Sequence, residues 1–242
     1  MKVLIAITVF NEERHVTKVL AEIRTAVQTD ILVIDDGSTD ATPAILARRR
    51  GIRVLRHRDN FGYGKSLADA FHYAAADRYD WVITMDCDEQ HEPASLGCFI
   101  AAAARDEADI ISGSRYLLSG DRRDQPPPDR RNINILITQV VNRRLGLHLT
   151  DSFCGFKAHR VAAMNRLRLT EPGYAFPMQF WVQAVRAGLR IAELPVRLIY
   201  NDPSRHFGGH LDDPNRRLRH YLEVFFRELE AVDLCTQCAA SG

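Results

Sequence analysis

Two aspartates separated by one residue form the clearest chemical signal in the sequence. Asp86 and Asp88 follow an apolar run, residues 81–85, that has the length and composition of a short buried strand. Carboxylates at the end of such a strand can converge on one hard cation, and Gln90 can add a neutral oxygen. Oxygen ligands favour Mg²⁺ or Mn²⁺ over zinc, and these ions often bind substrate phosphates as well. The alternative is an acidic turn that only ends the strand.

A second acidic loop follows another predicted strand. The apolar residues 31–34 lead into Asp-Asp-Gly-Ser-Thr-Asp at 35–40. Along the chain, the patterns predict strands at 2–9, 31–34, 52–55, 81–85 and 109–113, and helices at 16–27, 41–50, 67–74 and 93–104. This alternation predicts an α/β fold with a mostly parallel central sheet and helices on both faces. Such sheets bind ligands outside the carboxyl ends of their strands, where Asp36 and Asp86 are both expected.

The pattern is less regular after residue 114. Residues 117–131, with three consecutive prolines at 126–128, predict a mobile loop that serves as a lid or binds an acceptor. Amphipathic helices are predicted at 133–147, 174–187 and 214–232, and a last strand at 189–200. The first and last of these helices either pack on the domain or lie on a membrane surface.

Composition and missing motifs exclude several classes of function. A net charge of +1 gives no basic excess for binding nucleic acid. No apolar run reaches the roughly 18 residues of a membrane span, and five scattered cysteines suit a reducing compartment, so we expect a cytoplasmic protein. Gly-Lys-Ser at 64–66 does not complete an ATP-binding P-loop, because Asp59 stands where that motif needs glycine.

Six motifs in order resemble the family 2 glycosyltransferases, in particular those that transfer mannose or glucose to dolichyl or polyprenyl phosphate. They lie at 8–12, 33–40, 60–65, 85–93, 113–116 and 151–157, and the resemblance spans about residues 3–212. It implies the GT-A fold, a nucleotide-sugar-binding α/β sandwich. We therefore expect a catalytic domain at residues 1–212, followed by an amphipathic helix and a polar tail at 213–242.

The resemblance also implies which residues form the site. The positions of the nucleotide pocket are matched by Thr8, Phe10, Glu12, Ile34 and Asp36. The segment that holds the metal and the diphosphate is matched by Asp86, Cys87, Asp88 and Gln90, with Asp86, Asp88 and Gln90 as metal ligands. The cations beside the donor and acceptor phosphates are matched by Arg115, Arg131 and Arg205, which we group with Asp88 as catalytic.

The expected reaction is inverting transfer of a hexose from a GDP- or UDP-linked sugar to a lipid phosphate, with possible peripheral contact to the cytoplasmic membrane face. The metal would neutralise charge on the leaving nucleoside diphosphate. A phosphate acceptor is already anionic, whereas a hydroxyl acceptor benefits from a carboxylate base. Family members with hydroxyl acceptors typically carry an acidic pair on the helix that matches 174–187, and this helix has Gln179 and Gln183 instead.

Two alternatives remain open from the sequence. One is a cytosolic transferase that acts on a saccharide or protein hydroxyl, with Asp151 as the base. The other is a non-catalytic protein that binds nucleotide sugars.

Overall fold

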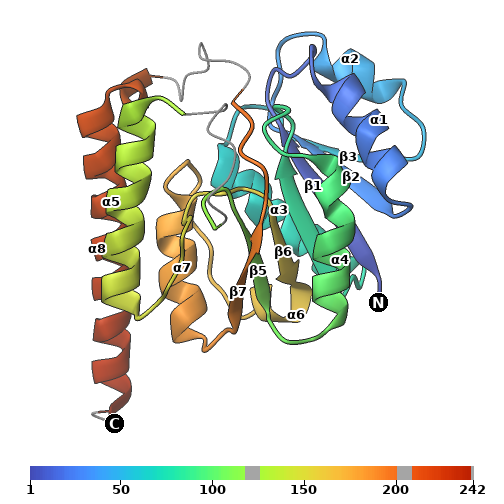
Figure 1. Cartoon of the computed structure of the whole chain (residues 1–242). Helices are drawn as coiled ribbons and strands as arrows, with labels where there is room; N and C mark the ends of the chain where they lie inside the picture. The colour runs from blue at the N-terminus through green and yellow to red at the C-terminus, as the bar shows by residue number, and fades with distance from the viewer. Residues whose placement is uncertain (118–125, 201–208, 241–242) are drawn as a thin grey trace.

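A single seven-stranded sheet forms the centre of the computed structural model, which describes residues 1–117, 126–200 and 209–240, and side chains up to residue 231 except that of residue 210. The strands lie in the order β3-β2-β1-β4-β6-β5-β7 (Figure 1). Their bounds are β1 Val3–Val9, β2 Asp30–Asp35, β3 Arg53–Arg56, β4 Trp81–Asp86, β5 Ile110–Ser114, β6 Lys157–Arg160 and β7 Ile191–Pro195. Only β6 runs antiparallel to its neighbours among these strands, so the prediction of a mostly parallel sheet is confirmed.

The register of the central strands brings the predicted acidic loops together. β1 pairs in parallel with β2 on one side and with β4 on the other, and Thr8 is the partner of both Ile34 and Asp86. Because parallel strands end at the same edge of a sheet, the loops after these three strands meet at that edge. One point at this sheet edge is therefore surrounded by the loops at 10–12, 36–40 and 87–91.

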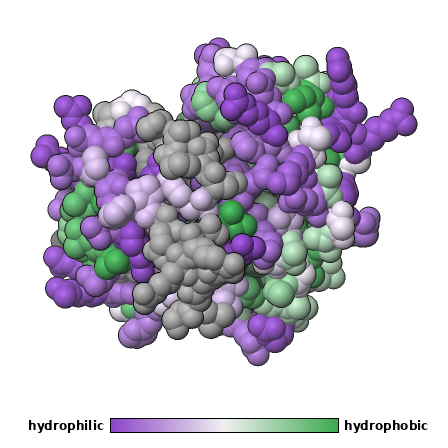
Figure 2. All heavy atoms as spheres, turned by 45° about the horizontal axis from the view of Figure 1, so that its top comes forward, coloured by the Kyte–Doolittle hydropathy of each residue, from purple (hydrophilic) through white to green (hydrophobic). Residues whose placement is uncertain are grey.

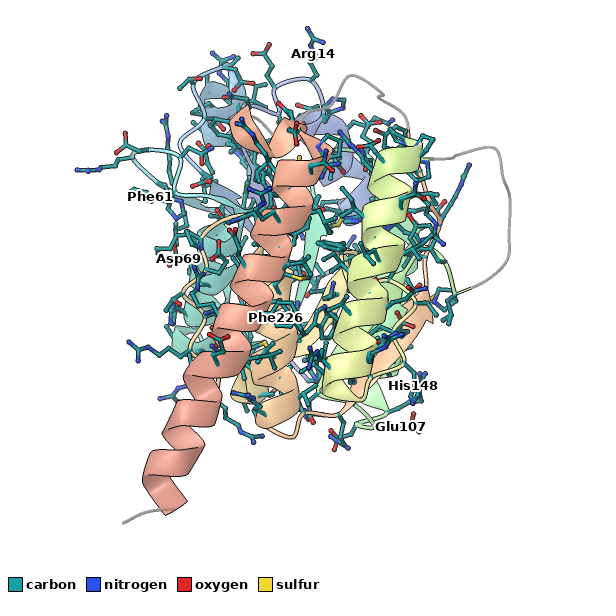
Figure 3. All side chains as sticks on the ribbon, turned by 90° about the vertical axis from the view of Figure 1, so that its left-hand side faces the viewer. Arg14, Phe61, Asp69, Glu107, His148 and Phe226 are labelled. Atoms are coloured by element: carbon teal, nitrogen blue, oxygen red, sulfur yellow. The ribbon has the colours of Figure 1, made fainter. Side chains whose placement is uncertain are left out.

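Helices cover both faces of the sheet, and two of them form an outer layer (Figure 1). The longer helices are α1 Val16–Ala26, α3 Tyr63–Ala76, α4 Leu96–Ala104, α5 Pro128–Leu145, α7 Phe176–Arg186 and α8 Pro214–Ala240. The shorter ones are α2 Thr42–Ala47, η1 Pro93–Ser95, α6 Val161–Met164 and η2 Gly209–Asp212. α5 and α8 lie side by side and pack on α7 rather than on the sheet (Figure 3).

Strand β1 shows why these strands are apolar without alternation. Ile5 and Ile7 pack into the core cluster on the side of α1 and α4, whereas Leu4 and Ala6 pack into the cluster that α3, α7 and α8 share. All four residues are 0% exposed. A strand that is buried on both faces needs apolar side chains at successive positions, as the sequence predicted.

Several predicted boundaries in the second half of the chain were wrong. α5 begins at Pro128 instead of residue 133, because proline fits the first position of a helix, where no backbone N–H is needed. Arg131 therefore lies in a helix and not after a loop. β7 ends at Pro195 and does not continue to residue 200, while α8 runs on to Ala240. Residues 118–125 of the predicted mobile loop, and Arg205, lie outside the described residues.

Within the part of the chain that is described, no helix combines the length and the apolar character required to cross a membrane.

Candidate active site

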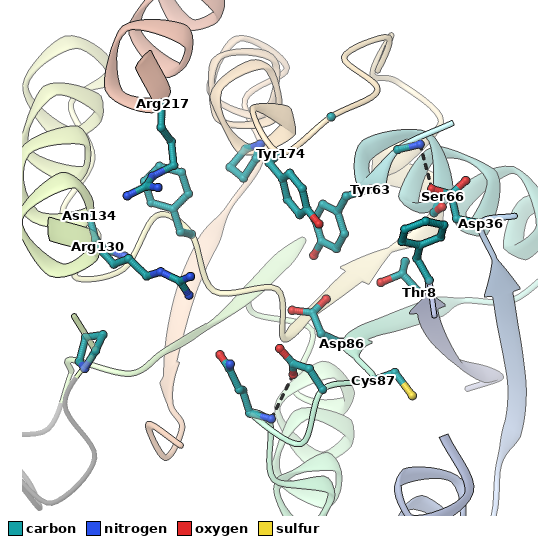
Figure 4. Close-up of a pocket in the computed structure, with 18 of the residues that line it drawn as sticks. Thr8, Asp36, Tyr63, Ser66, Asp86, Cys87, Arg130, Asn134, Tyr174 and Arg217 are labelled. Atoms are coloured by element: carbon teal, nitrogen blue, oxygen red, sulfur yellow. Dashed lines mark hydrogen bonds between the residues drawn. The ribbon is translucent and has the colours of Figure 1, made fainter. Parts of the chain in front are cut away.

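A pocket of about 710 Å³ lies at the edge where β1, β2 and β4 end, and it extends to α5, α7 and α8 (Figure 4). Most of the site residues expected from the sequence line it, namely Thr8, Phe10, Glu12, Asp36, Asp86, Cys87, Asp88, Gln90 and Arg115. Polar side chains dominate the face of the molecule above the strand ends (Figure 2). The structure thus brings the two acidic loops and Arg115 into one cavity.

Two expected residues are placed differently, and a third is not described. Ile34 is fully buried in the core between the sheet and α3, so its side chain cannot contact a ligand, and that expectation is corrected. The guanidinium of Arg131 lies 3.5 Å from the centre of the Tyr116 ring, and the preceding Arg130 lines the pocket in its place. This shift follows from the earlier start of α5. Arg205 is outside the described residues.

The loop after β4 is held in a defined conformation by its own side chains. The backbone N–H of Asp86 donates to Nδ1 of His91 over 3.1 Å, and that of Gln90 donates to Oδ1 of Asp88 over 3.0 Å. Glu89, between them, has a positive φ of 59°. Its carboxylate contacts His15 at 2.9 Å and also Lys18, so α1 anchors the loop from outside. The turn that carries the two aspartates is therefore held by hydrogen bonds within the loop and by contacts with α1.

The surroundings of Asp86 and Asp88 fit a divalent cation that arrives with a diphosphate. A Cβ atom on Gly155 would lie 2.6 Å from Oδ2 of Asp86 and 2.7 Å from the hydroxyl of Tyr63, so only glycine leaves room for this carboxylate. No group of three or more His, Cys, Asp or Glu side chains in the described residues could hold a metal. Mg²⁺ typically uses one or two carboxylates and completes its shell with water and substrate phosphates.

Burial governs the charge of Asp86. Burial raises the pKa of its carboxyl group above the ordinary value, His91 opposes this shift, and the negative charge of Asp88 adds to it. A cation between two close carboxylates would favour their ionised forms.

At the opposite wall, Asp36 organises a turn through hydrogen bonds. Its Oδ1 accepts from the backbone N–H of Phe61 at 2.9 Å, and its Oδ2 accepts from that of Gly62 at 2.8 Å. His57 contacts Oδ1 of Asp36 through Nδ1 at 2.6 Å and Asp69 through Nε2 at 2.9 Å. Asp36 is therefore fixed at the pocket surface by a buried network.

Glycine is required where this turn approaches the segment before α7. Gly62 has a φ of +101°, and a Cβ there would lie 2.4 Å from the backbone oxygen of Pro172. At Gly64, a Cβ would lie 2.2 Å from the backbone oxygen of Glu171. Gly62 thus permits the tight turn into α3, and Gly64 allows the first turn of this helix to pack closely on that segment.

Arg115 is paired with Asp151 beneath the pocket. Its Nε donates to Oδ2 of Asp151 at 2.6 Å and a terminal nitrogen donates to Oδ1 at 3.0 Å. Asn134 donates to the same carboxylate at 2.9 Å. Burial would raise the pKa of Asp151, but the charge and hydrogen bonds of Arg115 and the bond from Asn134 lower it to about 2. Asp151 is fully buried, does not line the pocket and is held by Arg115 and Asn134, so it is poorly placed to be the base that the hydroxyl-acceptor alternative needs.

Most residues at the far end of the pocket, away from the strand ends, were not predicted from the sequence. This end is lined by residues from α5, α7, α8 and the segments before β6, before α7 and after β7, which include Arg130, Ile133, Asn134, Phe153, Tyr174, Pro177, Leu198, Tyr200, Arg217 and Tyr221. Arg130, Asn134 and Arg217 face Thr8 and Asp36 across the cavity, with Asp86 between them (Figure 4). The arginine-rich start of the last helix was visible in the sequence, but we expected that helix to lie outside the catalytic domain.

The glutamines of α7 point away from this end of the pocket. Gln179 and Gln183 donate to Glu228 of α8 at 2.9 and 2.6 Å, so they join two helices. Among the described residues that line the pocket, the carboxylates are Glu12, Asp36, Asp86 and Asp88, which come from the loops at the strand ends. The far end combines arginines with aromatic and apolar side chains instead.

Comparison with known proteins gives a consistent result. Residues 4–168 match the family model described as "Glycosyl transferase family 2". The chain is 30% identical over 219 residues to undecaprenyl-phosphate mannosyltransferase from Micrococcus luteus, covering 86% of this chain and 89% of that one. It is 27% identical to polyprenol monophosphomannose synthase from Mycolicibacterium smegmatis, covering 81% and 76% of the two chains.

A solved structure has the same fold. Glucosyl-3-phosphoglycerate synthase from Mycobacterium tuberculosis, in complex with Mn²⁺, UDP and glucosyl-3-phosphoglycerate, aligns with a TM-score of 0.70 at 19% identity. The alignment covers 94% of this chain and 79% of that chain. The expected GT-A fold is thereby confirmed.

Proposed function

The chain belongs to glycosyl transferase family 2 and is a glycosyltransferase, and we propose that it transfers a hexose, with inversion, from a GDP- or UDP-linked sugar to a polyprenyl phosphate. The relatives from Micrococcus luteus and Mycolicibacterium smegmatis carry names with this acceptor class. The donor would lie over the strand ends and the acceptor would enter from the end formed by α5, α7 and α8.

One observation supports the choice of a phosphate as the acceptor. The far end of the described pocket has Arg130 and Arg217 but no carboxylate from α7 that could act as a base. Arginine side chains suit a phosphate, which they can bind through charge-assisted hydrogen bonds. The aromatic and apolar residues beside them, such as Phe153 and Tyr221, suit the first isoprene units of a lipid.

The mechanism requires the protein to bind and orient two anionic substrates. Asp86 and Asp88, with Gln90, would hold Mg²⁺ or Mn²⁺, which supplies a positive charge for the leaving diphosphate. Arg130 would hold the acceptor phosphate with one oxygen directed at the anomeric carbon. This oxygen is already anionic near neutral pH, so no proton needs to be removed before it attacks. The bond to the diphosphate then breaks on the opposite face of the sugar, which gives inversion.

A transfer assay tests this function. The protein would be incubated with Mn²⁺, a radiolabelled GDP-mannose or UDP-glucose, and undecaprenyl phosphate in detergent. Label that moves into the organic phase with one of the donors is the expected result. Efficient transfer to a free saccharide, with none to the lipid phosphate, would contradict the proposal. A thermal-shift panel with GDP, UDP and ADP, with and without Mn²⁺, identifies the donor class independently.

A membrane contact through α5 is the second part of the proposal. Ile135 and Leu136 are 38% and 43% exposed on the side of α5 that faces away from the core, and apolar side chains gather at the edge where α5 lies (Figure 2). Ile133 and Asn134 of the same helix line the pocket. A helix with one face on the pocket and an apolar edge outside can bring the site to a lipid surface.

Vesicle flotation tests this contact. Replacing Ile135 and Leu136 together by glutamate is expected to reduce binding to vesicles that contain phosphatidylglycerol. Val54→Glu is the matched control, because Val54 is 43% exposed on β3, away from α5. Equal binding of both variants and the wild type would refute the role of α5.

A further inference from the structure

Residues 61–66, which enter and begin α3, connect the donor end of the pocket with the segment before α7. At the donor end, the backbone N–H groups of Phe61 and Gly62 hold Asp36. On the other side, the backbone N–H of Lys65 donates to the oxygen of Pro172 at 3.1 Å, in the segment before α7. One of these residues, Tyr63, reaches the middle of the pocket with its side chain.

The Tyr63 side chain makes two different contacts there. Its hydroxyl lies beside the carboxylate of Asp86, since a Cβ atom on Gly155 would be 2.7 Å from this hydroxyl and 2.6 Å from Oδ2 of Asp86. Its ring stacks on that of Tyr174, with 5.9 Å between the ring centres and 15° between the planes. Figure 4 shows both tyrosines beside Asp86. Gly155 leaves room for this arrangement, since a Cβ would collide with both oxygens.

Asp86 needs such a support because its other neighbours hold it loosely. Nε2 of His91 is 3.8 Å from Oδ2 of Asp86, which is too far for a hydrogen bond. A phenol that donates to a carboxylate restricts its rotation and leaves the second oxygen available to a cation. Groups that orient metal ligands in this way typically contribute ten- to one-hundredfold to metal affinity.

We propose that Tyr63 is a positioning residue that fixes Asp86 for the divalent cation, and that the stacked Tyr174 fixes Tyr63. The inference rests on the proposed metal-dependent transfer and adds a residue that the motif comparison did not assign. It also links the two ends of the site, because Tyr174 belongs to the acceptor side of the pocket. A change in that wall would therefore alter the metal site through the stacked rings.

The test is the affinity for Mn²⁺ in the presence of GDP or UDP, measured from the electron paramagnetic resonance signal of free Mn²⁺. Tyr63→Phe keeps the stacked ring and removes the hydroxyl, so its dissociation constant for Mn²⁺ should rise about tenfold. Tyr73→Phe is the matched control, since Tyr73 lies on the same helix but bonds to Arg53 at the surface. The control should bind Mn²⁺ like the wild type.

A second variant tests the stacking. Tyr174→Leu leaves the Tyr63 hydroxyl in place and should weaken Mn²⁺ binding by roughly two- to tenfold, the range expected for loss of one aromatic pair. In both variants the KM for Mn²⁺ should rise while kcat at saturating Mn²⁺ stays close to the wild-type value. A merely structural role would instead lower the melting temperature and leave the Mn²⁺ affinity unchanged.

Parallel transfer assays separate the inference from the proposed function. An unchanged Mn²⁺ affinity in Tyr63→Phe overturns the inference even if the wild type glycosylates the lipid phosphate. A weakened affinity in Tyr63→Phe supports the inference even if the acceptor turns out to be different. A wild-type protein that binds no Mn²⁺ with either nucleotide overturns the inference.

Discussion

The two ends of the pocket are built in different ways. The donor end consists of loops that directly follow β1, β2 and β4, and the register of three adjacent strands places them. The acceptor end consists of side chains from α5, from the segment before α7 and from α8, which are far apart in the sequence. The donor end therefore depends on local motifs, whereas the acceptor end depends on how helices pack against one another.

The largest expected effect comes from removing one carboxylate charge at the donor end. Asp88→Asn removes the charge of a proposed metal ligand without changing the shape of the side chain, so transfer should fall by about 10³-fold or more. The melting temperature should change little, because Asp88 is only partly buried. Glu22→Gln, on the surface of α1, is the control for loss of one carboxylate. Residual activity within tenfold of the wild type would show that Asp88 does not hold the cation.

A second variant introduces a steric clash at the donor end and leaves its charges unchanged. Gly155→Ala would place a Cβ 2.6 Å from Oδ2 of Asp86, so the carboxylate must move, and we expect transfer to fall ten- to one-hundredfold. Gly97→Ala is the matched control, because a Cβ at Gly97 meets no atom within 4 Å. Steady-state kinetics at varied Mn²⁺ would reveal the loss as a higher KM for the metal. Equal kinetics of the two variants would contradict the crowded geometry at Asp86.

The Arg115–Asp151 pair between the two ends gives a prediction on pH. The pKa of Asp151 is about 2 in the folded protein, below its ordinary value of 3.8, so the pair stabilises the fold above about pH 4. This contribution, of the order of 2 kcal/mol, should disappear as the pH falls from 4 to 2. Chemical denaturation at several pH values should show a smaller loss over this window for Asp151→Asn than for the wild type. Equal pH dependence would argue against the pair.

The smallest expected effect tests the acceptor end alone. Arg130→Gln removes one charge that faces the proposed phosphate, so the KM for undecaprenyl phosphate should rise about tenfold, while the KM for the donor stays constant. Arg143→Gln, in the exposed last turn of the same helix, is the control. A change in the KM of the donor, with none for the acceptor, would reverse the assignment of the two ends.

The same contrast explains what the sequence could predict. The strand ends carry their chemistry in short motifs, so the sequence alone was enough to predict that Thr8, Asp36, Asp86 and Asp88 share one pocket. Ile34 was misplaced because a motif match does not state which face of a strand a side chain occupies. Tyr63 belongs to the motif at 60–65, but no role was assigned to it. Tyr174 and Tyr221 gave no signal, since an aromatic residue on an amphipathic helix is most often part of the core.

Arg131 illustrates a different cause of error. Because α5 starts five residues earlier than predicted, both arginines lie on a helix, where Arg130 lines the pocket and Arg131 covers the Tyr116 ring. Successive residues on a helix point about 100° apart, and one position is enough to change a side chain's environment. Sequence patterns rarely fix a helix start to one residue.

The family match ends at residue 168, within the segment before α7, although the pocket continues to Tyr221. The helices α7 and α8 that complete the acceptor wall are tied to each other by Glu228 and both glutamines of α7. These two helices thus form a unit that could be exchanged between relatives while the donor loops stay untouched. Grafting residues 169–240 from a homologue with another lipid acceptor would be a direct route to engineer acceptor choice in this enzyme.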